Sequence, residues 1–205
     1  PSISHHIFNS NTKYNYDIKF NAHSIYNDES YDIKRWSGFG KINKKFNFTN
    51  ITLEADANIG TDLYSIQGRP STDNNDNRYI DRISSGFSVA ASNQYGFITD
   101  RTSIIIEPKI QFSSVFSSDR TDEVPNRDSA EFKLDPANLF LNNQFQGRDN
   151  IQENDRINLG VTSLIMTESS GDINFFIGQI QILSGTQKNV ALANKDRQSH
   201  IINSI

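Results

Sequence analysis

The 205-residue chain contains no cysteine, which excludes disulfide frameworks, thiol catalysis and cysteine-ligated zinc. Long apolar runs are also absent: the mean hydropathy is −0.58. No stretch approaches the ~20 apolar residues that a membrane-spanning helix needs. Positive charge is not in excess either, since 20 Lys and Arg face 24 Asp and Glu. A nucleic-acid-binding protein would carry a basic stripe, so no nucleic-acid partner is expected.

What the sequence does contain is alternation of apolar and polar residues with period two, which predicts strands. The cleanest run is 51–63, where Leu53 and Ile59 alternate with Glu54 and Asn58. Strands of globular proteins usually hold ~5–6 residues, whereas a tilted membrane-crossing strand needs ~9–11. This run is long enough to cross a bilayer. Its polar face must also meet water, as it would in the lumen of a barrel.

The same alternation recurs along the chain and predicts further strands at 13–26, 97–116, 78–91, 156–166, 173–183, 1–8, 31–46 and 200–205. In 173–183, the order Phe175-Phe176-Ile177 leaves the outward side undecided. We predict an all-β fold, an antiparallel up-and-down transmembrane β-barrel segment of about eight to nine strands. The start at Pro1 and the strand that reaches Ile205 suggest a piece of a longer protein, with an export signal upstream.

The alternation also sorts side chains onto two faces. The polar face is predicted to line a lumen and includes Asp17, Lys19, Glu54, Asp56, Asn58, Asp62 and Arg101. The apolar face is predicted to contact lipid and includes Tyr14, Ile18, Phe20, Leu53, Ile59, Ile104, Ile110 and Phe112. For any single lumenal charge, we expect a satisfied cross-strand neighbour rather than contact with a transported substrate.

Connections between the predicted strands alternate in length. Short turns are predicted at 9–12, 46–50, 92–96 and 168–172, and longer polar connections at 67–77, 117–155 and 184–198, with 27–30 as a short member of the second set. Short turns at one rim and long loops at the other are typical of outer-membrane barrels, in which the short turns are periplasmic. We therefore treat 1–205 as one region that contains 117–155 as a long surface or lumenal loop.

Between 104 and 181 the chain carries a specific series of motifs. They are Glu107-Pro108-Lys109, Pro125-Asn126-Arg127-Asp128-Ser129, Asn138-Leu139-Phe140, Asn143-Gln144-Phe145-Gln146-Gly147-Arg148-Asp149, Asp155-Arg156-Ile157-Asn158-Leu159-Gly160 and Ile177-Gly178-Gln179. In order and spacing the series resembles the C-terminal barrel domain of the LptD family, also called organic solvent tolerance proteins. Lys109, Gln144 and Asn150 stand where that family commonly has arginine, and neither lysine nor an amide reproduces the guanidinium fork.

The resemblance implies a transporter rather than an enzyme, without a cofactor. In that family, lipopolysaccharide arrives from a periplasmic bridge through an N-terminal domain that this sequence does not include. It then passes through the barrel into the outer leaflet of the outer membrane of a Gram-negative bacterium. An LptE-like lipoprotein plugs the lumen. The resemblance further implies that the present strands form an arc of a larger barrel, with outer-membrane lipid against the apolar face.

The long loop carries apolar residues that something must bury, among them Leu139, Phe140 and Phe145. Asp135 followed by Pro136 suits the start of one helical turn. We expect the loop to fold into the barrel mouth, with its charges tied to the lumenal face. These loop charges are Asp128, Arg148, Asp149 and Arg156, and their expected partners on the lumenal face include Glu107 and Lys109. A plug that stabilises the barrel is favoured over direct contact with transported lipid.

Two other classes stay open. A soluble all-β glycan-binding module would pack its apolar faces sheet on sheet. A barrel hydrolase would need a histidine beside serine or aspartate at one rim, but His23 falls within a predicted strand and has no such partner in the sequence. No metal site is expected, because His5 and His6 are adjacent and point to opposite faces of a strand.

Overall fold

The computed structural model describes residues 2–9, 14–25, 32–67, 78–118, 123–126, 128–131, 135–143, 145–168, 171–185 and 200–204. Its strands are β1 (Ser2–Asn9), β2 (Tyr14–Ile25), β3 (Asp32–Asn47), β4 (Ile51–Gln67), β5 (Arg78–Asn93), β6 (Tyr95–Ile98), β7 (Thr102–Ser117), β8 (Ala130–Glu131), β9 (Phe145–Gln146), β10 (Asn154–Thr167), β11 (Gly171–Gly185) and β12 (His200–Ser204). In these ranges no helix is long and apolar enough to span a membrane.

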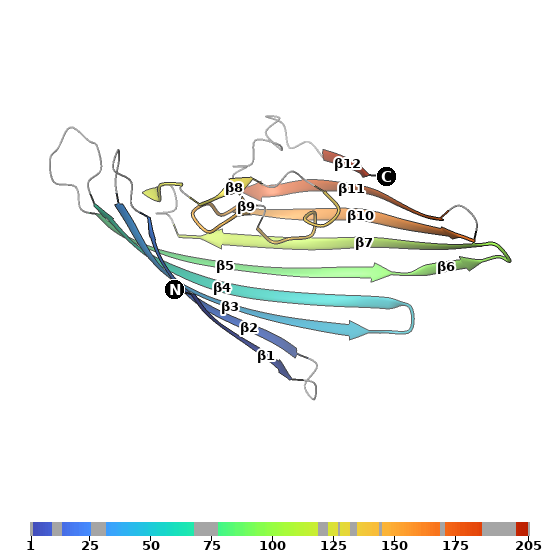
Figure 1. Ribbon diagram of the computed structural model, residues 1–205, viewed down its shortest axis with the longest axis horizontal. Helices are drawn as coiled ribbons and strands as arrows, with labels where there is room; N and C mark the ends of the chain where they lie inside the picture. Colours follow the sequence, from blue (N-terminus) through green and yellow to red (C-terminus); the bar gives the residue numbers. More distant parts are fainter. Residues whose placement is uncertain are drawn as a thin grey trace.

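The strands form one curved antiparallel sheet in the order β1-β2-β3-β4-β5-β7-β10-β11-β12, with β6 beside β7 (Figure 1). Each long strand pairs with its neighbour in the chain, so the predicted up-and-down topology is confirmed. The strands β3, β4, β5 and β7 hold 16 or 17 residues each, more than the ~9–11 needed to cross a bilayer. Over the described residues β1 and β12 remain open edges, as expected for part of a barrel.

The two faces of this sheet differ in exposure. Among the described residues, the large apolar side chains that are exposed lie on one face, which we call the outer face, with three exceptions: Phe48, Ile98 and Leu141. Ile59 is 61% exposed and Leu63 is 52% exposed. A sandwich would have sealed these side chains between two sheets. The other described sheet is only the two-stranded pair β8–β9, so the fold does not support the soluble sandwich alternative.

The opposite face carries the long connection between β7 and β10, and we call it the loop-bearing face. β8 and β9 belong to this connection (Figure 1). The sequence predicted the loop but not this short pair of strands. Parts of the predicted connections at 9–12, 27–30, 67–77 and 184–198 fall outside the described residues. The turn at 46–50 is confirmed, with the Phe48 N–H donating to the Ile51 carbonyl at 2.9 Å.

The turn predicted at 92–96 is wrong, because β5 and β6 continue in one register against β7. Ser92 lies opposite Lys109, and the register continues unchanged into the β6–β7 pairing. Asn93 therefore falls opposite Pro108, which has no N–H to donate. That missing donor explains why the strand pattern breaks at Gln94 and then resumes. Pro108 interrupts the ladder without reversing the chain.

The chain reverses further on, between β6 and β7. The Thr99 N–H donates to the Thr102 carbonyl at 2.9 Å, which closes a two-residue hairpin turn. Arg101 lies in this turn and is exposed. Its predicted place on the lumenal wall is therefore wrong, because the alternating pattern was extended past the end of the strand.

Candidate functional site

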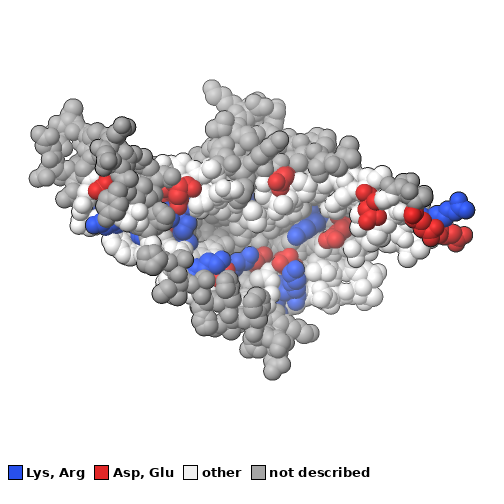
Figure 2. Space-filling model, in the orientation of Figure 1, with Lys and Arg blue, Asp and Glu red and all other residues white. Residues whose placement is uncertain are grey.

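The polar residues predicted for β2 and β4 share the loop-bearing face. They are Asp17, Lys19, Glu54, Asp56, Asn58 and Asp62, brought into line by the pairing of β2, β3 and β4. Cross-strand contacts satisfy several of them: Lys41 Nζ lies 2.8 Å from Asp56 Oδ1, and the Asn43 amide donates to Glu54 Oε1 at 2.8 Å. Figure 2 shows basic and acidic side chains interspersed across the molecule. The face is therefore highly polar but largely charge-paired.

The predicted apolar set occupies the outer face. Its described side chains are Ile18, Phe20, Leu53, Ile59, Ile104, Ile110 and Phe112. Tyr14 belongs to β2, but its side chain lies outside the described part of the structure. Phe112 contacts Phe87 of the neighbouring strand, with ring centroids 5.8 Å apart. Gln179 also lies on the outer face, whereas Gly178 lies on the loop-bearing face.

The centre of the site is a buried ion pair between adjacent strands. Arg82 of β5 and Asp62 of β4 are both 0% exposed, and Arg82 Nη2 donates to Asp62 Oδ2 at 2.7 Å. Arg82 also reaches the loop: Nη1 donates to the Asp149 carbonyl at 2.6 Å, and Nη2 donates to the Arg148 carbonyl. One arginine thus joins two strands and the loop. Buried charges are tolerated when they are paired and hydrogen-bonded in this way.

A second arginine extends the network to β3. Arg35 Nη1 donates to Asp128 Oδ2 at 2.6 Å and to Asp149 Oδ1 at 2.7 Å. The Tyr64 hydroxyl accepts from Arg82 at 2.9 Å and donates to Asp149 at 3.1 Å. This hydroxyl links the two arginine-centred parts into one connected network.

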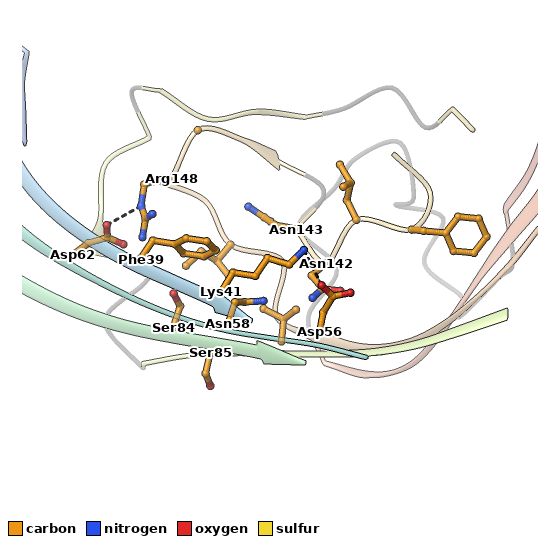
Figure 3. Close-up of a pocket in the computed structure, with 15 residues that line it drawn as sticks. Phe39, Lys41, Asp56, Asn58, Asp62, Ser84, Ser85, Asn142, Asn143 and Arg148 are labelled. Carbon is orange, nitrogen blue, oxygen red and sulfur yellow. Dashed lines mark hydrogen bonds and ion pairs between the residues drawn. The ribbon is translucent and has the colours of Figure 1, made fainter. Parts of the chain in front are cut away.

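The third arginine comes from the loop itself. Arg148 Nε donates to Asp62 Oδ1 at 3.0 Å, and its guanidinium lies 5.5 Å from the centroid of the Phe39 ring (Figure 3). The network therefore contains three arginines and three aspartates and is neutral in formal charge. We call these residues, with Tyr64, the docking network: Arg35, Asp62, Tyr64, Arg82, Asp128, Arg148 and Asp149.

Within the loop, two of the sequence motifs bind each other. The Asp128 carboxylate accepts from the backbone N–H groups of Arg148 and Asp149, each at 3.0 Å. In return, the Asp128 N–H donates to Asp149 Oδ2 at 2.9 Å, and the Asn150 N–H donates to Ser129 Oγ at 2.8 Å. Burial alone would raise the pKa of Asp128, but these amides and Arg35 together hold that pKa below its usual range.

Other motif residues shape the same clamp. Asn126 Oδ1 accepts from the Ser129 N–H at 2.9 Å, directly after Pro125. Gly147 adopts φ +79°, and a Cβ there would collide with the backbone carbonyl of Asp128. Phe145 is buried in β9, opposite Glu131 of β8. The spacing of the two motifs thus serves a short antiparallel contact that presents Asp128 and Asp149 to Arg35.

A second anchor fixes the other end of the loop to β10 and β11. Leu139 is 0% exposed and packs against Phe176, Ile180 and Ile182. The inward position of Phe176 settles the register that the sequence left undecided: Phe175 and Ile177 face outward. Gly178 leaves the space that this packing needs, because a Cβ there would come 2.6 Å from Leu139 and 2.7 Å from Phe176.

The helical turn predicted at Asp135 is confirmed as a single capped turn. Asp135 Oδ1 accepts from the backbone N–H groups of Ala137 and Asn138, at 2.8 and 3.0 Å. Asn138 Oδ1 accepts from the Asp135 N–H at 2.9 Å, so the two side chains cap each other reciprocally. The Leu139 N–H donates to the Asp135 carbonyl at 3.1 Å. This turn delivers Leu139 and Phe140 to the sheet.

The predicted partners of the loop charges need correction. Asp128, Arg148 and Asp149 contact Arg35, Asp62 and Arg82 rather than Glu107 or Lys109. Lys109 does contact the loop, but through the Phe140 ring, whose centroid lies 4.7 Å from Nζ. Arg156 donates to the backbone carbonyls of Leu141 and Asn142. The alternation identified the correct face for Glu107 and Lys109 but not which inward residues lie beneath the loop.

Between the sheet and the loop lies a cavity of about 240 Å³. Its walls include Phe39, Lys41, Asp56 and Asn58 from the sheet and Asn142, Asn143 and Arg148 from the loop (Figure 3). Lys41 and Asp56 extend towards each other at this cavity, and Arg148 points at Asp62 (Figure 3). Apolar side chains such as Phe140 and Ile151 line the cavity beside these amides and paired charges, and the described residues contain no cluster of metal-binding side chains.

These features define a class of protein. A single up-and-down sheet with an exposed apolar face, a polar opposite face and a loop docked on the polar face is a segment of a membrane β-barrel. The sequence profile described as LptD, LPS transport system D, matches residues 1–204, and the chain belongs to the LptD family. It is a family of outer-membrane transport proteins rather than of enzymes. No curated protein sequence matches the chain.

Proposed function

We propose that this chain forms part of the wall of a translocon that moves lipopolysaccharide into the outer leaflet of the outer membrane of a Gram-negative bacterium. The supporting observation is the family match over residues 1–204 on a sheet whose two faces differ so sharply. Exposed apolar side chains such as Ile59 and Leu63 would contact outer-membrane lipid. The polar face would line the water-filled interior.

Transport along this face needs no covalent chemistry. A sugar-rich, anionic head group exchanges hydrogen bonds with water for hydrogen bonds with side chains at little net cost. Pairs such as Lys41 with Asp56 offer donors and acceptors while neutralising each other. A neutral, hydrated wall would let the head group pass without trapping it. For each individual charge, a structural role towards its cross-strand neighbour remains the first assignment.

The docked loop would act as a plug that also stabilises the wall. The docking network attaches it to β3, β4 and β5, and Leu139 attaches it to β11. These two anchors lie on separate parts of the sheet, so the loop bridges across the loop-bearing face. Motif residues Asp128, Gly147, Asp149, Leu139 and Gly178 all serve this bridge. Direct contact of the loop with transported lipid is the second candidate role.

The partners follow from the family and belong to this proposal. An LptE-like lipoprotein would fill the part of the lumen that the loop leaves open. Lipopolysaccharide would arrive through a periplasmic bridge and an N-terminal domain outside this sequence. The hydrolase alternative has no observation in its favour among the described residues, in which His23 pairs with Arg35 in the β2–β3 ladder, two residues before β2 ends.

The test is to deplete the full-length protein in its own host and measure lipopolysaccharide at the cell surface. We expect surface lipopolysaccharide to fall and to recover when the wild-type gene is restored. Arg82→Ala should detach the loop from the sheet and so increase the uptake of large antibiotics. Lys45→Gln alters the ion pair of a half-exposed lysine and should leave that uptake unchanged. Unchanged surface lipopolysaccharide after depletion would contradict the proposal.

A further inference from the structure

Two arginines of the described sheet are fully buried, and they differ in one respect. Arg82 and Arg156 are each 0% exposed. Arg82 lies against the Asp62 carboxylate. Arg156 has no carboxylate within salt-bridge distance among the described residues, and its Nη2 donates only to the backbone carbonyls of Leu141 and Asn142. Its Nε and Nη1 are buried and make no hydrogen bond with the described part of the chain.

The surroundings of Arg156 are neutral. Across the ladders its neighbours are Ser113 of β7 and Ile182 of β11. The adjacent acid, Asp155, is engaged elsewhere, accepting hydrogen bonds from Ser114 and Ser184. The cation is therefore not compensated by the sequence neighbour that might have paired with it.

The inward residues on either side of Arg156 also have unfilled hydrogen-bonding capacity. Asn158 donates from Nδ2 to Gln111 Oε1 at 2.8 Å, and Gln111 Nε2 donates to the Phe140 carbonyl at 3.0 Å. These bonds fix the orientation of Asn158 and leave its Oδ1 buried without a hydrogen-bond partner in the described part of the chain. Asn154 Nδ2 and Oδ1 are buried without such a partner too. One cation thus lies in a layer of neutral polar groups that are only partly satisfied.

A buried, uncompensated guanidinium is costly, and structures retain one where a ligand or a partner supplies the missing charge. Water could fill the hydrogen bonds but would not neutralise the charge. We propose that Arg156 is the binding residue for an anionic oxygen group, a phosphate or a carboxylate, which it takes in place of the carbonyls of Leu141 and Asn142. This inference rests on the proposed transport function, which brings a head group of that chemistry past the loop.

The geometry explains why the exchange would be local. The guanidinium fork binds phosphate and carboxylate oxygens bidentately and more strongly than it binds neutral carbonyls. An arriving anion therefore competes with the loop corner at Leu141 and Asn142. The docking network is neutral and independent of Arg156, so Asp128 and Asp149 keep the rest of the loop in place. Arg156 would then bind the anionic group and release the loop segment at Leu141 and Asn142.

The experiment uses the full-length protein in detergent, with Leu141→Cys carrying an environment-sensitive fluorophore. Leu141 is 43% exposed, and this chain has no cysteine of its own. The probes are bisphosphorylated lipid A, the same lipid after removal of its phosphates, and inorganic phosphate. We expect phosphorylated lipid A to change the fluorescence of the wild type and of the Lys45→Gln control. In Arg156→Gln the apparent affinity should be about tenfold weaker or the response absent.

The outcomes separate the sources. A response to phosphorylated lipid A alone identifies a lipid head group, and an equal response to inorganic phosphate identifies a free anion; both support the site. Equal responses to all three probes, or an unchanged response in Arg156→Gln, would overturn it. If Arg156→Gln does not fold, Arg156→Lys decides, since it keeps the charge but loses the fork and should respond more weakly. A third outcome separates the two proposals. If the labelled protein restores surface lipopolysaccharide but its fluorescence does not change with any phosphate-containing probe, this inference is wrong and the proposed function still holds.

Discussion

Arg82 and Asp62 lie opposite each other on β5 and β4, fully buried and joined by two hydrogen bonds of 2.7 and 3.3 Å. Asp62 also accepts from Ser37 at 2.6 Å and from Arg148 at 3.0 Å. The pair is therefore the point where the sheet and the loop share one carboxylate. The attraction between the two charges should add little net stability to the folded protein. Removing only one of them should cost much more, because the other charge then stays buried without its partner.

Removing one partner tests that view. Arg82→Met should leave Asp62 buried and short of a cation, at a cost of about 3–5 kcal/mol in the free energy of unfolding. The double variant Asp62→Asn with Arg82→Met should recover part of that loss, because neither charge then remains buried alone. Denaturant unfolding of the detergent-solubilised protein measures both. Lys45→Ala is the control and should cost only about 0–1 kcal/mol, since its ion pair is partly exposed. A loss in Arg82→Met no larger than in Lys45→Ala would contradict the network.

The clamp within the loop makes a prediction for glycine. Gly147 has φ +79° and no room for a Cβ beside the Asp128 carbonyl. Gly147→Ala should therefore separate Asp128 from the Arg148 and Asp149 amides, at a cost of about 1–3 kcal/mol for the docked state. Limited proteolysis should cut this loop faster than in wild type. Gly96→Ala is the matched control, because nothing lies within 4 Å of a Cβ at that position. Equal cleavage rates for the two variants would argue against the clamp.

The apolar anchor can be tested separately from the charges. Leu139→Ala should remove contacts with Phe176, Ile180 and Ile182 and leave a cavity, at a cost of about 2–5 kcal/mol. Hydrogen exchange of the amides near Leu139 should become faster while those near Asp128 stay protected. Leu141→Ala provides the comparison, because Leu141 is 43% exposed and loses little on truncation. Simultaneous loss of protection at both ends would mean that the two anchors form one cooperative unit.

The pH dependence of loop docking follows from Asp128. Its pKa is depressed in the folded state, so its stabilising contribution is fully present above the unfolded value, about 3.9. That contribution is lost as the pH falls from there through the folded pKa. Docking should therefore be insensitive to pH between about 5 and about 8 and weaken only below about 4. The fluorescence of a label at the exposed Ala137 can follow this. Asp128→Asn should weaken docking at neutral pH, and a wild-type midpoint near neutrality would exclude Asp128 as the cause.

Sequence alone predicted much of the sheet and less of the site, for a physical reason. Period-two alternation reports which face a residue occupies, so Asp62 and Ile59 were assigned to opposite sides of β4 correctly. It does not report which inward residues meet. Arg35 and Asp149 are separated by 114 residues in sequence, and the sequence around each residue does not identify the other as its partner. Arg82 was missed because it stands in a strand with a weak pattern, although a charge at an inward position was the available signal.

The last prediction concerns the chain expressed by itself. The outer face exposes side chains such as Phe20 at 60% and Ile59 at 61%, and the described sheet ends in the unpaired edges of β1 and β12. Exposed apolar surface of this extent and open strand edges both promote association in water. We therefore expect residues 1–205 alone to aggregate in buffer and to need detergent, as measured by light scattering and size-exclusion chromatography. Detergent hides the apolar face but not the edges, so oligomers should persist in micelles. A monodisperse, water-soluble monomer would contradict the membrane assignment of the outer face.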